Sequence, residues 1–403
     1  MTSSNSSSRR IILLGCGAMA QGTAYALSLS GKNEDLLLVD RDEASCNRLA
    51  SWVRSHAPSL AVDTLRADVE NANDDDALRR AVESAAAVGM AMPWSATRRA
   101  LSVLSECGTP IASITRPHYP SVPDLDREIA GVRGRVLLPI GLEPGLTEIL
   151  GIEAASRLAK VDELAIWCGG IPEQPRPPLN HLVLFGDRLA VAERTAYAVE
   201  DTHIVEMNRF DGCQSITING VGVLEAHHDG MLPWFPLDRA VAGARTVTQK
   251  TIRWPGYTES IFFLRRFGLL DDRPIEINGT HVSPQRVVEK ILGPTIVRRE
   301  GDVDITVLRV EARGTDASGQ KSVVRLQCID RSDPATGLSS MARTTGFTLA
   351  TALRTIAQPD NLGLAIGILR PHEIFRGDAA RKLIRRLCDL GVDISVEAMP
   401  WRF

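Results

Sequence analysis

Short apolar runs alternate with amphipathic stretches over the first 160 residues of the chain. The runs are almost entirely apolar rather than alternating with polar residues, and the stretches between them carry apolar residues at helical spacing. Strands buried on both faces have this composition, and the strand–helix–strand rhythm is typical of a parallel sheet covered by helices. The pattern therefore predicts an α/β domain with a doubly wound parallel sheet. The expected strands are 11–14, 36–39, 60–65, 88–92, 111–114 and 136–140, and the expected helices are 18–30, 43–56, 76–85 and 96–106.

The pattern changes after Lys160. Residues 171–178 are rich in proline and cannot form a regular helix or a central strand. Alternating strands follow, and the last two flank a turn-rich connection at 315–320. From residue 342 the helical pattern returns, and a short apolar strand follows at 392–396. We therefore predict a second domain with a mixed or antiparallel sheet, whose strands include 214–219, 246–253, 304–313 and 322–329.

Composition narrows the class of protein. The chain has 403 residues, of which 44% are hydrophobic, and 46 basic against 49 acidic residues give a net charge of −3. This balance argues against a nucleic-acid partner, and no apolar stretch approaches the ~18–20 residues that cross a bilayer. Residues 1–8 are polar and serine-rich, which predicts a disordered tail rather than a signal peptide.

The cysteine and histidine patterns bear on metal and redox chemistry. Seven cysteines are scattered without a C-x-x-C pair, as expected for reduced thiols in a cytoplasmic protein. His227 and His228 are adjacent, and adjacent residues seldom chelate one ion. The sequence therefore predicts no metal site.

Residues 15–20 (GCGAMA) match the pattern G-x-G-x-x-[GA]. Chance gives roughly 0.5 matches in a chain of this composition, so the context decides. An expected strand precedes the motif and an expected helix follows it. Gly15 permits the tight turn, Gly17 lets the backbone approach a pyrophosphate, and the helix N-terminus donates N–H groups to the phosphates. The motif predicts a dinucleotide-binding Rossmann domain, the alternative being a tight turn in a non-binding α/β domain. The predicted cofactor-binding residues here are Gly15, Gly17, Ala18, Met19 and Ala20, the last of which allows close packing of helix on strand.

Asp40 ends the second expected strand, 20 residues after Ala20. A carboxylate there accepts the ribose hydroxyls of an adenosine and repels a 2′-phosphate, which favours NAD. NADP stays a possible cofactor because an arginine at the position of Arg41 can hold the 2′-phosphate. A second alternative is that Asp40 is an ordinary turn residue. Asp68, Met92 and Pro93, near the ends of the next two expected strands, complete the predicted cofactor site.

Five regions, in order along the chain, resemble the saccharopine dehydrogenase-like family, most closely its lysine 6-dehydrogenase branch. They are residues 15–20, 141–146 (GLEPGL), 168–172 (CGGIP) through 177–181 (PPLNH), 250–256 (KTIRWPG) and 341–345 (MARTT). The resemblance implies a Rossmann domain over 9–145 that 342–403 return to complete. It also implies an inserted α+β substrate domain over 146–341, whose sheet often forms the interface of a homodimer in the family. Residues 141–145 and 168–170 look equally like saccharopine reductase.

Oxidising an amine by hydride transfer requires a substrate clamp and one general base, because the cofactor does the redox step. Arg253 closes an expected strand and is the candidate clamp for a carboxylate, the alternative being a surface arginine. His181 and Glu143 are the candidate catalytic residues, with a structural histidine and a helix cap as alternatives. Arg343 and Thr344 begin the returning helix, where they either contact substrate or phosphate or simply start the helix.

The resemblance and these residues predict an NAD-dependent oxidative deamination of the ε-amino group of L-lysine, or of a close ω-amino acid, to a semialdehyde that cyclises. Two alternatives stay open. One is the reductive condensation of an amine with a carbonyl compound, as in saccharopine- or carboxynorspermidine-forming relatives. The other is an NAD-binding regulator without catalytic activity, which would have no use for Arg253 and His181 together.

Overall fold

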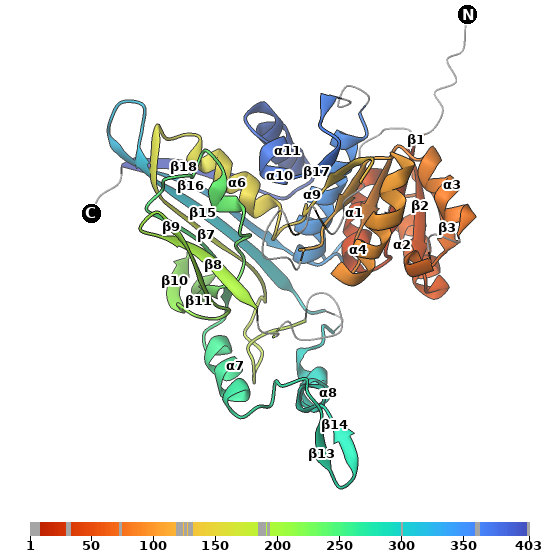
Figure 1. Ribbon diagram of the computed structural model, residues 1–403, viewed down its shortest axis with the longest axis horizontal. Helices are drawn as coiled ribbons and strands as arrows, with labels where there is room; N and C mark the ends of the chain where they lie inside the picture. Colours follow the sequence, from red (N-terminus) through yellow and green to blue (C-terminus); the bar gives the residue numbers. More distant parts are fainter. Residues whose placement is uncertain are drawn as a thin grey trace, which may run out of the picture. The chain divides into compact units, whose positions relative to one another are not determined.

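The computed structural model describes residues 9–29, 34–71, 75–117, 124, 127, 132–183, 191, 194–299, 301–358 and 363–400. The tail predicted at 1–8 lies outside the described residues. The chain divides into two compact units, the first formed by 1–156 with 333–395 and the second by 157–332 with 396–403 (Figure 1). In the described part of the chain, no helix combines the length and the apolar character that a membrane crossing requires.

The first unit contains a seven-stranded sheet in the order β17-β6-β5-β4-β1-β2-β3, and every neighbouring pair is parallel. Its central strands are mainly apolar and buried, whereas the edge strand β3 exposes four of its six residues. This order confirms the predicted doubly wound parallel sheet, with the strand order reversing between β1 and β4. The strands are β1 (Arg9–Leu14), β2 (Glu34–Asp40), β3 (Ala61–Arg66), β4 (Ala87–Met90), β5 (Ile111–Ser113), β6 (Arg135–Leu137) and β17 (Gly367–Leu369).

Some helices of the first unit begin at a residue whose side chain caps them. Asp42 accepts the backbone N–H groups of Ala44 and Ser45, and Ser339 accepts the N–H of Ala342. The helices are α1 (Ala18–Ser28), α2 (Glu43–His56), α3 (Asp76–Ser84), α4 (Trp94–Leu104), α6 (Leu146–Ala155), α9 (Ser340–Ile356), α10 (Pro371–Ile374) and α11 (Asp378–Asp389), with short 3-10 turns η1 (Val69–Asn71) and η2 (Ser105–Cys107).

Two glycines allow α1 and α9 to approach backbone to backbone. A Cβ atom added at Gly22 on α1 would lie 2.0 Å from the carbonyl oxygen of Ala342. One added at Gly346 on α9 would lie 2.5 Å from the backbone nitrogen of Thr23. The returning C-terminal segment is therefore packed directly on the helix that follows β1.

The second unit contains a nine-stranded mixed sheet. Its main path is β10-β11-β12-β7-β15-β16-β18, β8 pairs with β12 and β9, and β7 runs parallel to β12 but antiparallel to β15. This confirms the predicted mixed sheet. The strands are β7 (Lys160–Pro172), β8 (Thr195–Glu200), β9 (His203–Asn208), β10 (Gln214–Ile218), β11 (Gly222–His228), β12 (Thr246–Arg253), β15 (Asp304–Thr315), β16 (Lys321–Arg331) and β18 (Ile394–Pro400).

A smaller group of elements follows β12 in the second unit. The short strands β13 and β14 form a two-stranded sheet of their own between two helices (Figure 1). These elements are α7 (Tyr257–Arg266), β13 (Ile275–Ile277), β14 (Thr280–Val282) and α8 (Pro284–Ile296), and the 3-10 turn η3 (Phe235–Leu237) precedes β12.

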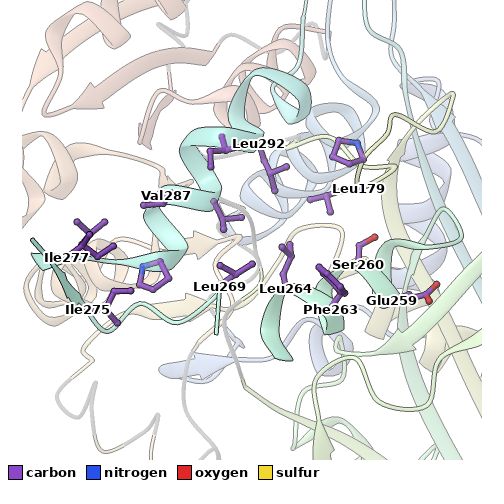
Figure 2. Close-up of a pocket in the computed structure, with 15 residues that line it drawn as sticks. Leu179, Glu259, Ser260, Phe263, Leu264, Leu269, Ile275, Ile277, Val287 and Leu292 are labelled. Atoms are coloured by element: carbon purple, nitrogen blue, oxygen red, sulfur yellow. The ribbon is translucent and has the colours of Figure 1, made fainter. Parts of the chain in front are cut away.

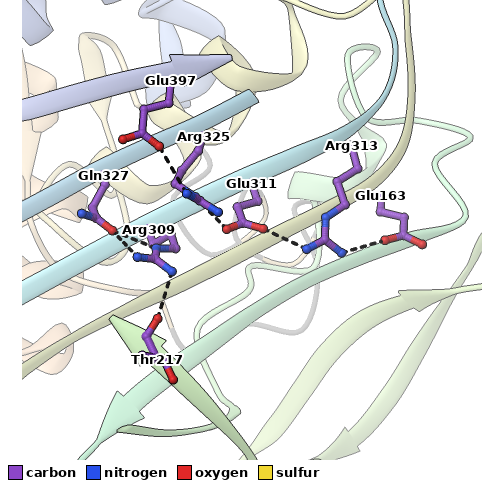
Figure 3. Close-up of polar contacts among 8 residues, drawn as sticks. All are labelled: Glu163, Thr217, Arg309, Glu311, Arg313, Arg325, Gln327 and Glu397. Carbon is purple, nitrogen blue, oxygen red and sulfur yellow. Dashed lines mark hydrogen bonds and ion pairs between the residues drawn. The ribbon is translucent and has the colours of Figure 1, made fainter. Parts of the chain in front are cut away.

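The last strand corrects one expectation. The sequence assigns 342–403 to the Rossmann domain, but β18 pairs with β16 in the second sheet. A polar network on this sheet supplies a physical reason (Figure 3). Glu311, 5% exposed, binds Arg313 and Arg325, and Arg325 also reaches Glu397 on β18 at 3.2 Å.

The unit boundaries also differ from the predicted ones at 145 and 342. Helix α6 belongs to the first unit, in which it contacts α10 and α11. All residues of α6 are buried, which means that the helix packs against apolar neighbours on more than one side. This packing explains why α6 belongs to the first unit.

Candidate functional site

A cavity of about 290 Å³ lies at the carboxyl ends of β1, β2 and β4 in the first unit. It is formed at the point where the strand order reverses, which is the usual ligand position in open α/β sheets. Of the predicted cofactor residues, the cavity brings together Gly15, Gly17, Asp40, Arg41, Asp68, Met92 and Pro93.

The two glycines of the G-x-G motif are required for different physical reasons. Gly15 has φ +92°, and a Cβ atom there would lie 2.6 Å from the carbonyl oxygen of Ala91. Gly17 precedes α1 and has open space where its Cβ would be, so a ligand can approach the backbone closely. The first turn of α1 carries no acidic residue. Its N–H groups and positive dipole end are therefore available to an anion.

Asp40 fixes the loop that it faces. Its Oδ2 accepts the N–H of Cys16 at 2.9 Å, and its Oδ1 accepts the N–H of Asp42 at 3.0 Å. The carboxylate thus shapes the cavity in addition to its predicted contact with a ribose. Ala18 is exposed at the start of α1, whereas Met19 and Ala20 are buried beneath the loop, and their cofactor roles stay predictions.

The second unit brings Arg253 and His181 together around one aromatic ring. Arg253 ends β12, and Tyr257, which is 2% exposed, begins α7. The guanidinium carbon of Arg253 lies 5.5 Å from the Tyr257 ring centroid, and the ring centroids of His181 and Tyr257 are 5.1 Å apart. Sequence reasoning missed Tyr257, because an aromatic residue after a Pro-Gly turn carries no distinctive pattern.

Arg253 has no acidic partner among the described residues. Its Nη1 donates to the carbonyl of Ile252 at 2.7 Å, and its buried Nε has no hydrogen-bond partner in the described part of the chain. Gly169 on β7 leaves room for this side chain, because a Cβ there would lie 3.0 Å from Nη1. The segment 168–172 pointed to the family, but nothing in it assigned Gly169 this role.

His181 is held in the neutral form. Burial, and in addition the positive charge of Arg253, keep the pKa of His181 well below its usual 6.5. Its Nδ1 is shielded and has no hydrogen-bond partner among the described residues. At neutral pH the imidazole can therefore accept a hydrogen bond, but the same lowered pKa makes it a weaker base than an exposed histidine.

A carboxylate organises the turn between Arg253 and Tyr257. Glu225 on β11 lies opposite Arg253 in the strand pairing and accepts the N–H groups of Gly256 at 2.9 Å and Thr258 at 2.6 Å. Asn180, next to His181, donates from Nδ2 to the carbonyl of Pro255 at 3.0 Å. These bonds fix both candidate residues to the same turn.

The neighbouring cations of the second unit already have partners. Arg194 and Arg209 both bind Asp229, and Lys250 donates to the carbonyl of Gly212 and the side-chain oxygen of Gln214. Within the described residues, no three His, Cys, Asp or Glu side chains gather as they would around a metal ion.

The other predicted site residues lie in the first unit. Glu143 is partly buried just before α6. Arg343 donates to the carbonyl of Gly391 at 2.7 Å, and its guanidinium lies over the ring of Phe347. Thr344 is fully buried and donates to the carbonyl of Ser340 at 2.8 Å. These contacts give Arg343 and Thr344 structural partners, and the functional roles of all three residues stay predictions.

A doubly wound sheet with a glycine loop at its switch point, joined to a mixed-sheet unit, defines a Rossmann-type dehydrogenase architecture. Residues 141–392 match the family model for the saccharopine dehydrogenase C-terminal domain. The chain therefore belongs to the saccharopine dehydrogenase family. This membership supports the activity of an oxidoreductase that uses a nicotinamide dinucleotide and acts on CH–NH groups.

Among the solved structures compared, one agrees in fold at a high TM-score. The apo saccharopine dehydrogenase (L-Glu forming) of Saccharomyces cerevisiae is similar at a TM-score of 0.78 and 18% identity, covering 97% of this chain and 100% of that one. GenD2 from gentamicin A biosynthesis, in complex with NAD, has a TM-score of 0.40 and 11% identity, with 98% and 97% covered. A myo-inositol dehydrogenase from Corynebacterium glutamicum ATCC 13032 has a TM-score of 0.39 and 11% identity, with 96% and 98% covered.

Proposed function

We propose that the chain catalyses the NAD-dependent oxidative deamination of the ε-amino group of L-lysine, or of a close ω-amino acid, to a semialdehyde that cyclises. The observation that carries this proposal is the guanidinium of Arg253, which has no acidic partner among the described residues and lies beside a neutral imidazole. A partly buried cation of this kind is satisfied by the carboxylate of a ligand, which a guanidinium grips through two hydrogen bonds.

The number of cationic side chains that a substrate could use in the second unit favours a substrate with one carboxylate. Arg194, Arg209 and Lys250 bind groups of the protein, whereas no carboxylate of the described residues binds Arg253. A saccharopine-type substrate carries more carboxylates and would require more cations around it. The second candidate, the reductive direction, is supported by the resemblance of 141–145 and 168–170 to saccharopine reductase.

The first unit has the groups that a dinucleotide requires. The backbone at Gly17 and the N-terminus of α1 would hold the pyrophosphate, and Asp40 would accept the ribose hydroxyls. The bound nicotinamide would supply hydride transfer. His181 is a candidate general base for a proton of the substrate nitrogen or of water, because a carboxylate bound to Arg253 would offset the positive charge that helps to lower its pKa. Glu143 is the other candidate for this role.

Cofactor choice gives a first expected result. Wild-type protein should bind NAD more tightly than NADP, because the Asp40 carboxylate repels a 2′-phosphate. Asp40→Ala should weaken NAD binding roughly 10- to 100-fold through a lost charged hydrogen bond, and should relax the preference. Fluorescence titration with both dinucleotides measures this, with Arg41→Ala as the neighbouring control. Tighter binding of NADP than NAD by the wild type would assign the choice to Arg41.

Cofactor reduction across a panel of amines tests the reaction. Lysine, ornithine, diaminopimelate and saccharopine should be compared by the absorbance of the reduced cofactor, and lysine should give the highest kcat/KM. A higher kcat/KM for saccharopine would replace the proposal with the second candidate. Dinucleotide binding without turnover of any amine would indicate the regulator.

A further inference from the structure

Two cysteine side chains meet beside the dinucleotide cavity of the first unit. Cys16 is the middle residue of the G-x-G motif and lines the cavity, whereas Cys46 is buried on α2. The Sγ of Cys16 donates to the Sγ of Cys46 at 3.7 Å, and the Sγ of Cys46 donates to the carbonyl of Leu65 at 3.9 Å. Both are free thiols. The two sulfur atoms are therefore in contact although the residues are distant in the chain.

Two carboxylates fix the backbone on both sides of this contact. Asp40 accepts the N–H of Cys16 at 2.9 Å and the N–H of Asp42 at 3.0 Å. Asp42 caps α2, and its carbonyl accepts the N–H of Cys46 at 3.2 Å. The glycine loop and the first turn of α2 are therefore tied to the same end of β2, which keeps the two thiols together.

A covalent bond between the two sulfurs would move the glycine loop. A disulfide holds its sulfur atoms ~2.05 Å apart, so they must approach each other by roughly 1.6 Å. Gly15 has little freedom to follow, because its N–H donates to the carbonyl of Val39 at 2.8 Å and its α-carbon packs against Ala91. The bond would therefore pull Cys16 and the open backbone at Gly17 towards α2, away from the position in which they would meet a pyrophosphate.

We propose that Cys16 and Cys46 are a redox modification site, and that the disulfide between them lowers the affinity of the first unit for its dinucleotide. The inference rests on the dinucleotide site of the proposed function and adds a control to it. Cys16 is partly exposed in the cavity and meets the oxidant, whereas the buried Cys46 lies within reach to form the disulfide.

A hydroperoxide is the oxidant. The thiolate of Cys16 attacks the terminal peroxide oxygen, the O–O bond breaks, and the leaving oxygen takes a proton to give an alcohol, or water from hydrogen peroxide. Cys16 is then a sulfenic acid. The sulfur of Cys46 attacks that of Cys16, the S–S bond forms, the S–O bond breaks, and the hydroxide leaves as water with the proton of Cys46. The two thiols together lose two electrons, which the peroxide gains.

The surroundings of the pair set its rate of oxidation. Burial raises the pKa of both thiols, and for Cys16 the neighbouring sulfur and the charges of Asp40 and Asp42 raise it further. Because the thiolate is the attacking species, oxidation should become faster by up to about tenfold per pH unit between roughly pH 7 and 9. The pair therefore rests in the reduced form and responds to sustained oxidation.

Reduced and oxidised samples of the full chain test the proposal. After treatment with hydrogen peroxide at about pH 8.5, peptide mass spectrometry should show Cys16 linked to Cys46. The Kd for NAD, measured by fluorescence titration, should be at least about tenfold higher for the linked protein than for the reduced one. Dithiothreitol should restore the reduced value.

Binding and oxidation should oppose each other to the same extent. If the disulfide raises the Kd for NAD by a given factor, saturating NAD must lower the equilibrium constant of disulfide formation by that factor. Equilibration in buffers of fixed thiol-to-disulfide ratio, with and without NAD, measures this. Saturating NAD should also slow the reaction with peroxide, because a dinucleotide in the cavity covers Cys16.

Cys46→Ala and Cys107→Ala are the matched variants. Cys46 does not line the cavity, so Cys46→Ala should bind NAD as the reduced wild type does, and peroxide should give no disulfide at Cys16. Cys107 lies on η2 of the same unit, is partly buried as Cys16 is, and also has a raised pKa because of burial. Cys107→Ala should therefore keep the full loss of NAD affinity on oxidation.

A cavity in the second unit supplies a control for general damage. It has a volume of about 710 Å³ and is enclosed by α7, the β13–β14 sheet and α8, with mainly apolar side chains around it (Figure 2). No cysteine is among the described residues that line it. Anilinonaphthalene sulfonate binds exposed apolar surface, so its fluorescence with the protein should be the same before and after oxidation.

Four results would overturn the proposal. They are a wild type that forms no link between Cys16 and Cys46, a linked protein whose Kd for NAD stays within about twofold of the reduced value, a link that forms equally fast under saturating NAD, and a rise in dye fluorescence that accompanies the lost affinity. These results leave the proposed function standing. Reduced protein that binds no dinucleotide would overturn both.

Discussion

Arg253→Ala should lower kcat/KM for lysine by about 30- to 4,000-fold. Truncating one partner of a charge-assisted bidentate contact costs ~2–5 kcal/mol, and each 1.36 kcal/mol is a factor of ten in rate. Arg253→Lys should recover only part of the loss, because an ammonium cannot reproduce the planar fork. Steady-state kinetics with lysine measures the effect, and NAD affinity should stay nearly unchanged because the cofactor residues lie in the first unit.

Two controls separate a clamp from a structural arginine. Cadaverine lacks the carboxylate, so it should react poorly with wild type and be almost indifferent to Arg253→Ala. Arg265→Ala removes another arginine of the second unit that lies over an aromatic ring, 5.2 Å from the centroid of Phe210, and should leave lysine turnover unchanged. Equal impairment of cadaverine and lysine turnover by Arg253→Ala, in protein that stays folded, would show that Arg253 is structural.

The parallel sheet of the first unit could be predicted because each of its central strands is a run of consecutive apolar residues. Strands β1, β2 and β4 are buried on both faces and read as continuous apolar runs, and Gly15 stands directly after β1. Strand β18 could not be assigned in this way. It pairs with β16, and its Glu397 contacts Arg325, so the pairing joins residues far apart in the chain. A local pattern contains no information about such a pairing.

The sequence named single residues of the candidate site but not how they are arranged. Arg253 and His181 were recognisable as chemistry-bearing side chains, whereas Tyr257, which lies between them, and Glu225, which holds their turn, act through geometry alone. Gly169 matters because of the side chain of Arg253 above it, and sequence spacing does not show that neighbour. By contrast, Asn278-Gly279 is a recognisable hairpin signal that could have located β13 and β14.

Gly22→Ala should destabilise the first unit by about 2–4 kcal/mol, although alanine favours helix over glycine by about 1 kcal/mol. The added Cβ would lie 2.0 Å from the carbonyl oxygen of Ala342, so α1 and α9 must separate. Because the atom it meets is backbone, no side-chain rotation relieves the clash. Thermal unfolding followed by circular dichroism should show a Tm lower by roughly 5–15 °C for a unit of this size.

Gly17→Ala is the matched control for Gly22→Ala, since it adds the same methyl group only five residues away. A Cβ atom at Gly17 meets no other atom within 4 Å, and its backbone is extended with φ −83°, which alanine adopts freely. This variant should keep the wild-type Tm but bind NAD more weakly, because the methyl group occupies the place where the backbone meets the pyrophosphate. If Gly22→Ala left the Tm unchanged, or if Gly17→Ala lowered it as much, close packing of α1 on α9 would not be what stabilises the returning C-terminal segment.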